Sequence, residues 1–161
     1  MIDEIDLVPL IVEHSRWRQL CVRLERIADA LPAMPTRIEI AALRCQVRDI
    51  FPATAEPPAF SLHALFQNEG SQPQVKTVLD GLRERRFSRT VEAQDLADMI
   101  AADHKRVCAD TLGYMLRAVF AGWRESIALE TLALLLIAPQ RLTAAARAVL
   151  LQHMPAEAAD S

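Results

Sequence analysis

The sequence predicts an all-α protein, specifically an up-and-down four-helix bundle with a short extra helix at its C-terminal end. Apolar residues recur at alternating spacings of three and four in four long segments, and no segment shows the two-residue alternation typical of a strand. Prolines and capping residues separate these segments by mostly short connections. The 161 residues are 52% hydrophobic but only 5% aromatic. Alanine and leucine therefore supply most of the apolar surface, as in helical bundles.

The first predicted helix runs from about Val8 to Leu31. Pro9 is tolerated in its first turn, and Pro32 ends it, because proline lacks the donor that a helix interior needs. One face of this helix repeats in the 3-4 rhythm that turns a stripe of side chains toward a core. Its members are Leu7, Leu10, His14, Trp17, Cys21, Leu24, Ala28 and Leu31.

The second predicted helix follows Thr36, which forms a capping-box pattern with Glu39 three residues later. Pro52 ends or kinks this helix. Residues 52–73 are the least regular part of the chain, with a Pro-Pro pair, a short apolar piece and an Asn-Glu-Gly-Ser turn. The apolar piece is Phe60, Leu62, Leu65 and Phe66, and its exposure would favour binding of a partner.

The third predicted helix begins near Gln74, and its apolar stripe is interrupted by Arg86 and Arg89 before it resumes. Either the helix continues with two arginines across its stripe, or it breaks near Ser88. We favour a continuous helix.

The fourth predicted helix spans about Asp110 to Ala138, and Thr143 then caps a short helix that ends near Met154. The inward stripe of the fourth helix contains two polar residues among its apolar ones. Its members are Leu112, Leu116, Val119, Trp123, Ser126, Glu130, Ala133 and Ile137.

Composition narrows the possible function classes. A net charge of −3 is too small to indicate a nucleic-acid or membrane partner. Three widely spaced cysteines favour a reducing, cytoplasmic compartment. The longest apolar run is far shorter than a membrane span. We expect one soluble domain over residues 1–154 and a frayed tail over 155–161. No phosphate loop, H-E-x-x-H or nucleophile elbow is present, so we expect no enzyme.

The polar residues within the apolar stripes are the candidates for function. A buried carboxylate is costly unless it is paired or binds a metal, so Glu130 needs a partner. Two structural alternatives stand beside a functional role. His14 could be a hydrogen-bonded histidine at the core edge, and Glu130 could reach water at the end of the bundle.

The order of several short motifs resembles the hemerythrin-like (HHE cation-binding) family of four-helix bundles. Members of that family often read Y-x-x-H-x-x-x-E, then an apolar run, then Leu-Thr before a short final helix. The similar segments here are Tyr114–Arg117, Trp123–Glu130, Leu134–Ala138 and Arg141–Thr143, preceded by Leu10–His14, Phe51–Phe66 and Leu79–Arg89.

The resemblance implies a dimetal centre held by histidines and carboxylates from all four helices. Only His14 and Glu130 keep ligand identities, and Glu56 or His63 are possible substitutes. The other ligand positions hold Pro58, Leu62, Arg86 and Ser126. Most metal-ligand positions are thus substituted, and we expect no cofactor.

A guanidinium offers a physical replacement for the metal. If Arg86 points inward, it can pair with Glu130 and donate to His14, giving a core polar cluster of His14, Arg86, Ser126 and Glu130. Two functions remain open. One is a non-catalytic regulatory or protein-interaction module, with an unknown protein partner or a homodimer. The alternative is a mono- or dinuclear iron protein with altered ligands, involved in oxygen, nitric oxide or iron sensing or storage.

Overall fold

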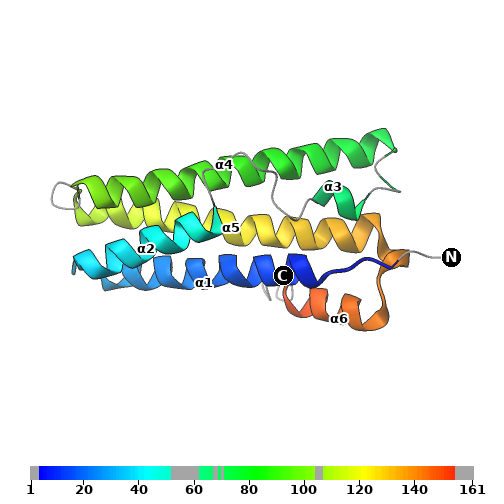
Figure 1. Ribbon diagram of the computed structural model, residues 1–161, viewed down its shortest axis with the longest axis horizontal. Coiled ribbons are helices and arrows are strands. Elements are labelled where there is room, and N and C mark those ends of the chain that lie inside the picture. Colours follow the sequence, from blue (N-terminus) through cyan, green and yellow to red (C-terminus); the bar gives the residue numbers. More distant parts are fainter. Residues whose placement is uncertain (1–3, 52–61, 67–68, 70, 104–106, 155–161) are drawn as a thin grey trace, which may run out of the picture.

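The computed structural model describes residues 4–51, 62–66, 69, 71–103 and 107–154, and it is all-α (Figure 1). This confirms the all-α part of the prediction, since no strand occurs in the described part of the chain. None of the described helices combines the length and the apolar character that crossing a membrane requires. The elements are α1 (Val8–Ala30), α2 (Arg37–Ile50), α3 (Leu62–Leu65), α4 (Pro73–Asp103), α5 (Ala109–Ile137), the 3-10 turn η1 (Pro139–Arg141) and α6 (Ala144–Gln152).

The local signals place the helix ends within one or two residues of their predicted positions. Thr36 accepts a hydrogen bond from the Glu39 amide while the Glu39 carboxylate accepts one from the Thr36 amide, which completes the capping box of α2. Thr143 caps α6 by accepting from the Ala146 amide. The third long helix, α4, continues without a break through Ser88, as predicted. The predicted tail lies outside the described residues.

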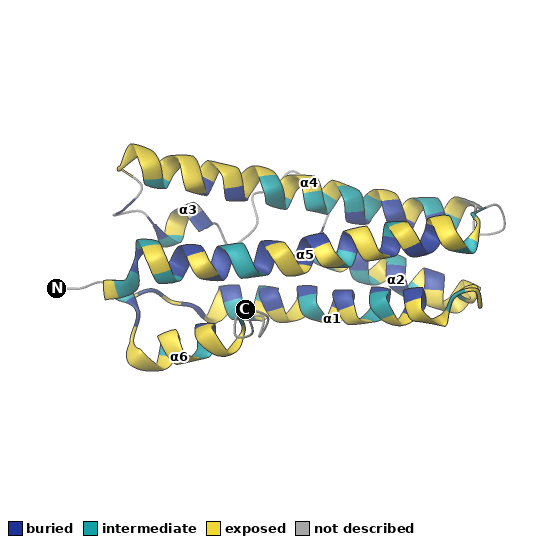
Figure 2. Ribbon diagram, turned by 180° about the vertical axis from the view of Figure 1, so that it is seen from behind, coloured by how far each residue is buried: buried dark blue, intermediate teal, exposed yellow. Residues whose placement is uncertain are grey.

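Three helices, α1, α4 and α5, run along most of the molecule, and α5 packs against both of the others (Figure 1). The shorter α2 packs against α1 and α4 over one half of that length. In the other half α3 packs against α4, and α6 folds back beside the beginning of α1. The inward faces of the long helices are buried and their outer faces exposed (Figure 2), as the 3-4 rhythm predicts.

The core consists of two separate apolar clusters, one in each half. The first cluster lies under α2 and contains the aromatic residues Trp17, Phe51 and Trp123. The second lies under α3 and α6 and is mostly aliphatic. Its buried members are Ile5, Leu7, Leu10, Leu62, Phe66, Leu79, Leu82, Ala133, Leu134, Ala138, Leu142 and Leu150.

The described residues of the short apolar piece after α2 pack inward rather than forming an exposed surface. Leu62 and Phe66 are 4% and 0% exposed, and Leu65 is half-buried. Phe60 lies outside the described residues. Because α2 ends at Ile50, it does not reach the second half, and α3 covers the core there instead. Leu62 and Phe66 therefore supply core packing and do not form the partner surface that their exposure would have favoured.

Candidate functional site

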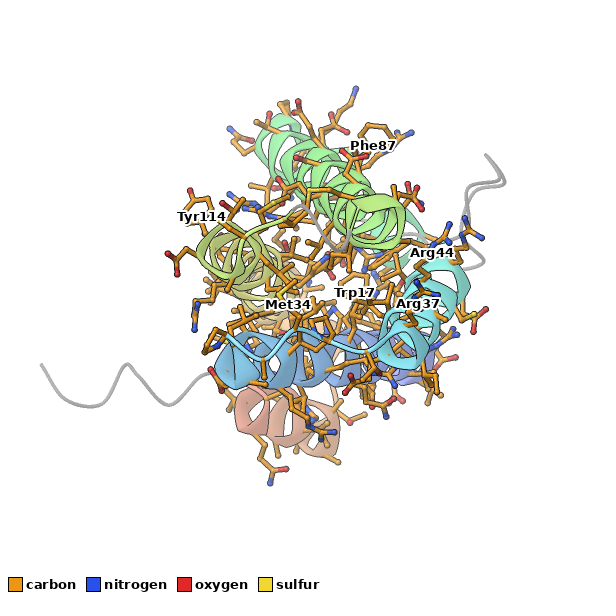
Figure 3. The ribbon with its side chains drawn as sticks, turned by 90° about the vertical axis from the view of Figure 1, so that its left-hand side faces the viewer. Trp17, Met34, Arg37, Arg44, Phe87 and Tyr114 are labelled. Atoms are coloured by element: carbon orange, nitrogen blue, oxygen red, sulfur yellow. The ribbon has the colours of Figure 1, made fainter. Side chains whose placement is uncertain are left out.

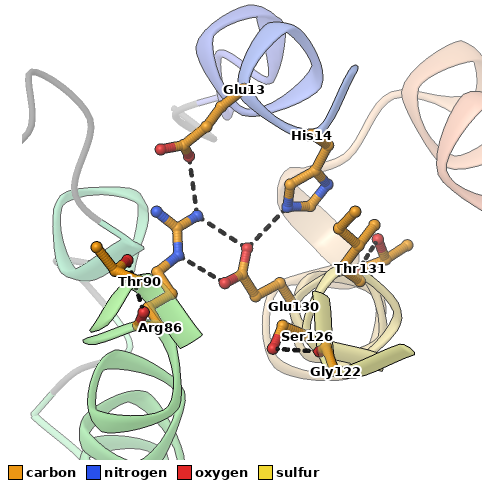
Figure 4. A network of polar contacts seen from close by, with 9 residues as sticks. Glu13, His14, Arg86, Thr90, Gly122, Ser126, Glu130 and Thr131 are labelled. Atoms are coloured by element: carbon orange, nitrogen blue, oxygen red, sulfur yellow. Dashed lines mark hydrogen bonds and ion pairs between the residues drawn. The ribbon is translucent and has the colours of Figure 1, made fainter. Parts of the chain in front are cut away.

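A polar layer separates the two apolar clusters. It is built by one residue from each long helix, His14 of α1, Arg86 of α4 and Glu130 of α5 (Figure 4). On each of these helices the layer residue stands between stripe residues of the two clusters. The flanking pairs are Leu10 and Trp17 on α1, Leu82 and Ala93 on α4, and Ile127 and Ala133 on α5.

Glu130 is the centre of this layer, and both of its carboxylate oxygens are engaged. Arg86 Nε donates to Oε1 at 2.6 Å, and Arg86 Nη2 donates to Oε2 at 2.8 Å. His14 Nε2 lies 2.7 Å from the same Oε2. Glu130 and His14 are buried, at 1% and 3% exposure. A two-pronged guanidinium–carboxylate pair forms charge-assisted hydrogen bonds that are stronger than neutral ones, and it satisfies both oxygens of a buried carboxylate.

Glu13 is a fourth member of the layer that the sequence analysis missed. Its Oε2 lies 3.0 Å from Nη2 of Arg86, and its side chain is 25% exposed. Glu13 precedes His14 and so points about 100° away from it around α1, off the apolar stripe. The stripe pattern carried no signal for it, because an acid at the edge of a helix face is ordinary.

Arg86 and Glu130 hold each other in their ionised forms. Burial alone would raise the pKa of Glu130, but hydrogen bonds from His14 and Arg86 and the charge of Arg86 together hold it below the usual range. Burial opposes the charge on Arg86, yet its contacts with Glu130 and Glu13 raise the Arg86 pKa. Burial raises the pKa of Glu13, although Arg86 counteracts this. Glu130 is therefore a carboxylate and Arg86 a cation at neutral pH.

Aromatic rings close the layer on the side of the first cluster. The guanidinium carbon of Arg86 lies 4.5 Å from the Trp17 ring centroid, and the His14 ring lies 5.3 Å from it. Trp123 and Phe51 pack behind, with centroids 4.6 Å apart. Seen along the helices, Trp17 lies among the helices while Phe87 and Tyr114 lie at the outside (Figure 3). A guanidinium over an indole face gains further stabilisation when it is desolvated.

The structure brings together three of the four residues of the predicted core polar cluster, and Ser126 lies beside them. Ser126 is buried one turn before Glu130, and its hydroxyl donates to the Gly122 carbonyl at 3.0 Å. This hydrogen bond satisfies Ser126 within its own helix. Of the possible substitute ligands, Glu56 lies outside the described residues. His63 belongs to α3, but its side chain is outside the described part of the structure.

The residues of the layer do not fit a metal ion. Within the described residues, no three His, Cys, Asp or Glu side chains come together as a metal site would require. The oxygens of Glu130 that would face a metal are held by Arg86 and His14, and the guanidinium would repel a cation. A set of ligands that included both His14 and Glu130 would first have to displace Arg86.

Comparison with known proteins identifies no relative, because no family model, curated protein or solved structure matches the chain.

Proposed function

We propose that this chain is a hemerythrin-like four-helix bundle in which a guanidinium stands in place of the dimetal centre. It acts as a non-catalytic regulatory or protein-interaction module in the cytoplasm. The observation that carries this proposal is the capture of both Glu130 oxygens by Arg86, with His14 on the same carboxylate. The positive charge that a metal would bring to this carboxylate is supplied by the protein itself.

The arrangement of the helices supports the four-helix part of the proposal. α1, α2, α4 and α5 pack in adjacent pairs, with α1 against α2, α2 against α4, α4 against α5, and α5 against α1. His14, Arg86, Ser126 and Glu130 occupy positions matching ligand positions of the resembled family. Three of these four side chains meet at one level of the molecule, as side chains arranged around a shared centre would do (Figure 4).

The non-catalytic part rests on the surroundings of the polar layer. Both oxygens of Glu130 are held by Arg86 and His14, so this carboxylate is not free to take a proton from a substrate. A cavity of about 790 Å³ lies elsewhere, where the end of α1 meets the beginning of α5. Its lining includes Leu31, Pro32, Gly113 and Tyr114 but none of the layer residues. The polar layer and this cavity therefore do not form one substrate site.

The first test is metal content, measured by elemental analysis on tag-free protein, as purified and after anaerobic ferrous loading. We expect well below one iron per chain, no oxo-bridge charge-transfer band, and a melting temperature that a chelator does not change. Near-stoichiometric iron, or two irons with that band, would establish the iron alternative instead.

A second experiment tests the family resemblance itself. The double substitution Arg86→His with Ser126→His would restore two histidines of the family pattern beside His14 and Glu130. We expect this variant to bind ferrous iron after anaerobic loading, with Arg86→Gln and Ser126→Ala together as the matched control. A folded double-histidine variant that takes up no more iron than the control would argue against a site inherited from a metal-binding ancestor.

A further inference from the structure

The last helix, α6, docks on the rest of the molecule through one buried leucine and through Ala146, which is half-buried against the same apolar cluster. It has nine residues, and Leu150, at 2% exposure, is its one buried residue. Its neighbour Leu151 is 56% exposed, and Ala144 and Ala148 also face solvent. Leu150 belongs to the second apolar cluster. We call five other members of that cluster the α6 site. They are Ile5 and Leu7 of the N-terminal segment, Leu10 at the start of α1, and Leu134 and Ala138 at the end of α5.

The side-chain hydrogen bonds of α6 are made with the residues that directly precede it. Arg147 Nη2 donates to the Pro139 carbonyl at 2.7 Å, and Thr143 accepts from the Ala146 amide. Within the described residues, no side chain of α6 forms a hydrogen bond or ion pair with α1 or α5. A helix shorter than about 12 residues is unstable alone in water, so α6 depends on the docking of Leu150 to remain folded.

The turn that precedes α6 is anchored independently of it. Arg141 Nη1 donates to the Leu65 carbonyl at 2.7 Å and to Glu69 Oε2 at 2.9 Å. The Arg141 carbonyl accepts from the Ile5 amide at 3.2 Å. These contacts hold η1, the N-terminal segment and the turn after α3 together. The chain is thus fixed up to Arg141, and α6 can leave its site without disrupting these contacts.

We propose that α6 is a displaceable helix and that the α6 site binds an amphipathic helix of a partner protein, which presents a leucine as Leu150 does. The proposal rests on the proposed role as an interaction module, and it assigns the surface and the class of partner. The bound α6 shows what the site accepts, a short helix with one apolar face. Helix-in-groove recognition uses this chemistry, and a longer partner helix would bury more surface than α6 does. In the closed state α6 occupies the site and competes with the partner.

The test uses the full chain with α6 released. Leu150→Asp should undock α6, because a charge cannot be buried among aliphatic residues. Leu151→Asp, at the exposed neighbour, is the matched control. The probe is a synthetic peptide of residues 143–153 with a hydrocarbon staple joining the solvent-facing positions 144 and 148. Binding is followed by amide NMR shifts of the ¹⁵N-labelled protein.

We expect the stapled peptide to bind the Leu150→Asp protein at least tenfold more tightly than the wild type or the Leu151→Asp control. Its shifts should cluster at the α6 site, and a peptide carrying Leu150→Asp should not bind. The proposal is overturned if the peptide binds all three proteins equally or none of them. It is also overturned if the Leu150→Asp protein instead dimerises through the exposed site, since the occupant would then be a second copy.

Hydrogen exchange on the wild type provides a test that needs no variant. We expect the amides of α6 to exchange at least tenfold faster than those of the buried parts of α1 and α5, by local undocking. Equal protection would show that α6 opens only with global unfolding, and it would refute the proposal even if Leu150→Asp failed to fold. None of these readouts depends on metal, so a metal-free protein with a fixed α6 would leave the proposed function standing and remove only this surface.

Discussion

The two halves of the molecule cover their apolar cores with different kinds of element. In the first half a single 14-residue helix with a complete capping box, α2, covers a core in which Trp17, Phe51 and Trp123 pack among aliphatic residues. In the second half three short pieces, α3, the N-terminal segment and α6, cover an aliphatic core. A long helix gains its stability cooperatively, whereas short pieces depend on each contact they make. We infer that the first half holds the domain together and that the second is where its surface can change.

The largest effect should come from breaking the layer between the halves. Arg86→Leu leaves Glu130 ionised and buried without its cation, and we expect it to lower the free energy of unfolding by about 3–5 kcal/mol. Urea denaturation measures this. The control is Arg85→Leu, because Arg85 pairs with Glu125 at the surface. That substitution should cost at most about 1 kcal/mol. An unchanged melting temperature for Arg86→Leu would contradict the buried pair.

A pair of leucine truncations compares the two cores directly. Leu43→Ala removes a side chain that is 1% exposed under α2, and we expect a loss of about 2–5 kcal/mol in global stability. Leu150→Ala removes one that is 2% exposed under α6. Because α6 can undock alone, its truncation should cost less than about half as much in urea denaturation while strongly increasing hydrogen exchange in α6. Equal losses in the global free energy of unfolding would mean that both halves unfold together, and that α6 does not undock alone.

The two threonine caps make a finer comparison. Thr36→Ala removes the capping box of α2, and we expect a loss of about 1 kcal/mol in the free energy of unfolding. Thr143→Ala removes the equivalent cap of α6. It should lower the global free energy of unfolding by less than Thr36→Ala does, because α6 contributes little to the cooperative unit. Losses of equal size would mean that α6 unfolds together with the first half rather than separately.

The sequence predicted local structure better than it predicted coverage of the core. Prolines, threonine caps and the 3-4 rhythm determine helix ends through interactions between residues close in sequence. The helix ends could therefore be predicted without a structure. The same rhythm located His14, Arg86 and Glu130, because residues of one inward stripe must meet something in the core. It could not show that α2 would cover only half of the domain, since that depends on the relative lengths of packed helices. The inward packing of Leu62 and Phe66 follows from that difference.

The cysteines offer the mildest test of the first core. Cys21 is 1% exposed, and burial raises its thiol pKa from 9.0 to about 11. The native state therefore keeps its proton between pH 9 and 11, while the unfolded chain loses it. The contribution of this thiol to stability is complete below about pH 9 and is lost as the pH rises through that window. The measurement is the difference in urea stability between wild type and Cys21→Ala as a function of pH.

This difference should shrink steadily above pH 9, while Cys45→Ala, a change at an exposed cysteine, should show no such trend. A thiol reagent gives an independent check at neutral pH, where the exposed Cys45 and Cys108 should react in the folded protein and Cys21 should not. Rapid labelling of native Cys21 would mean that the first half also opens locally. The contrast between a closed first half and an adjustable second half would then fail, and α6 would be one mobile element among several.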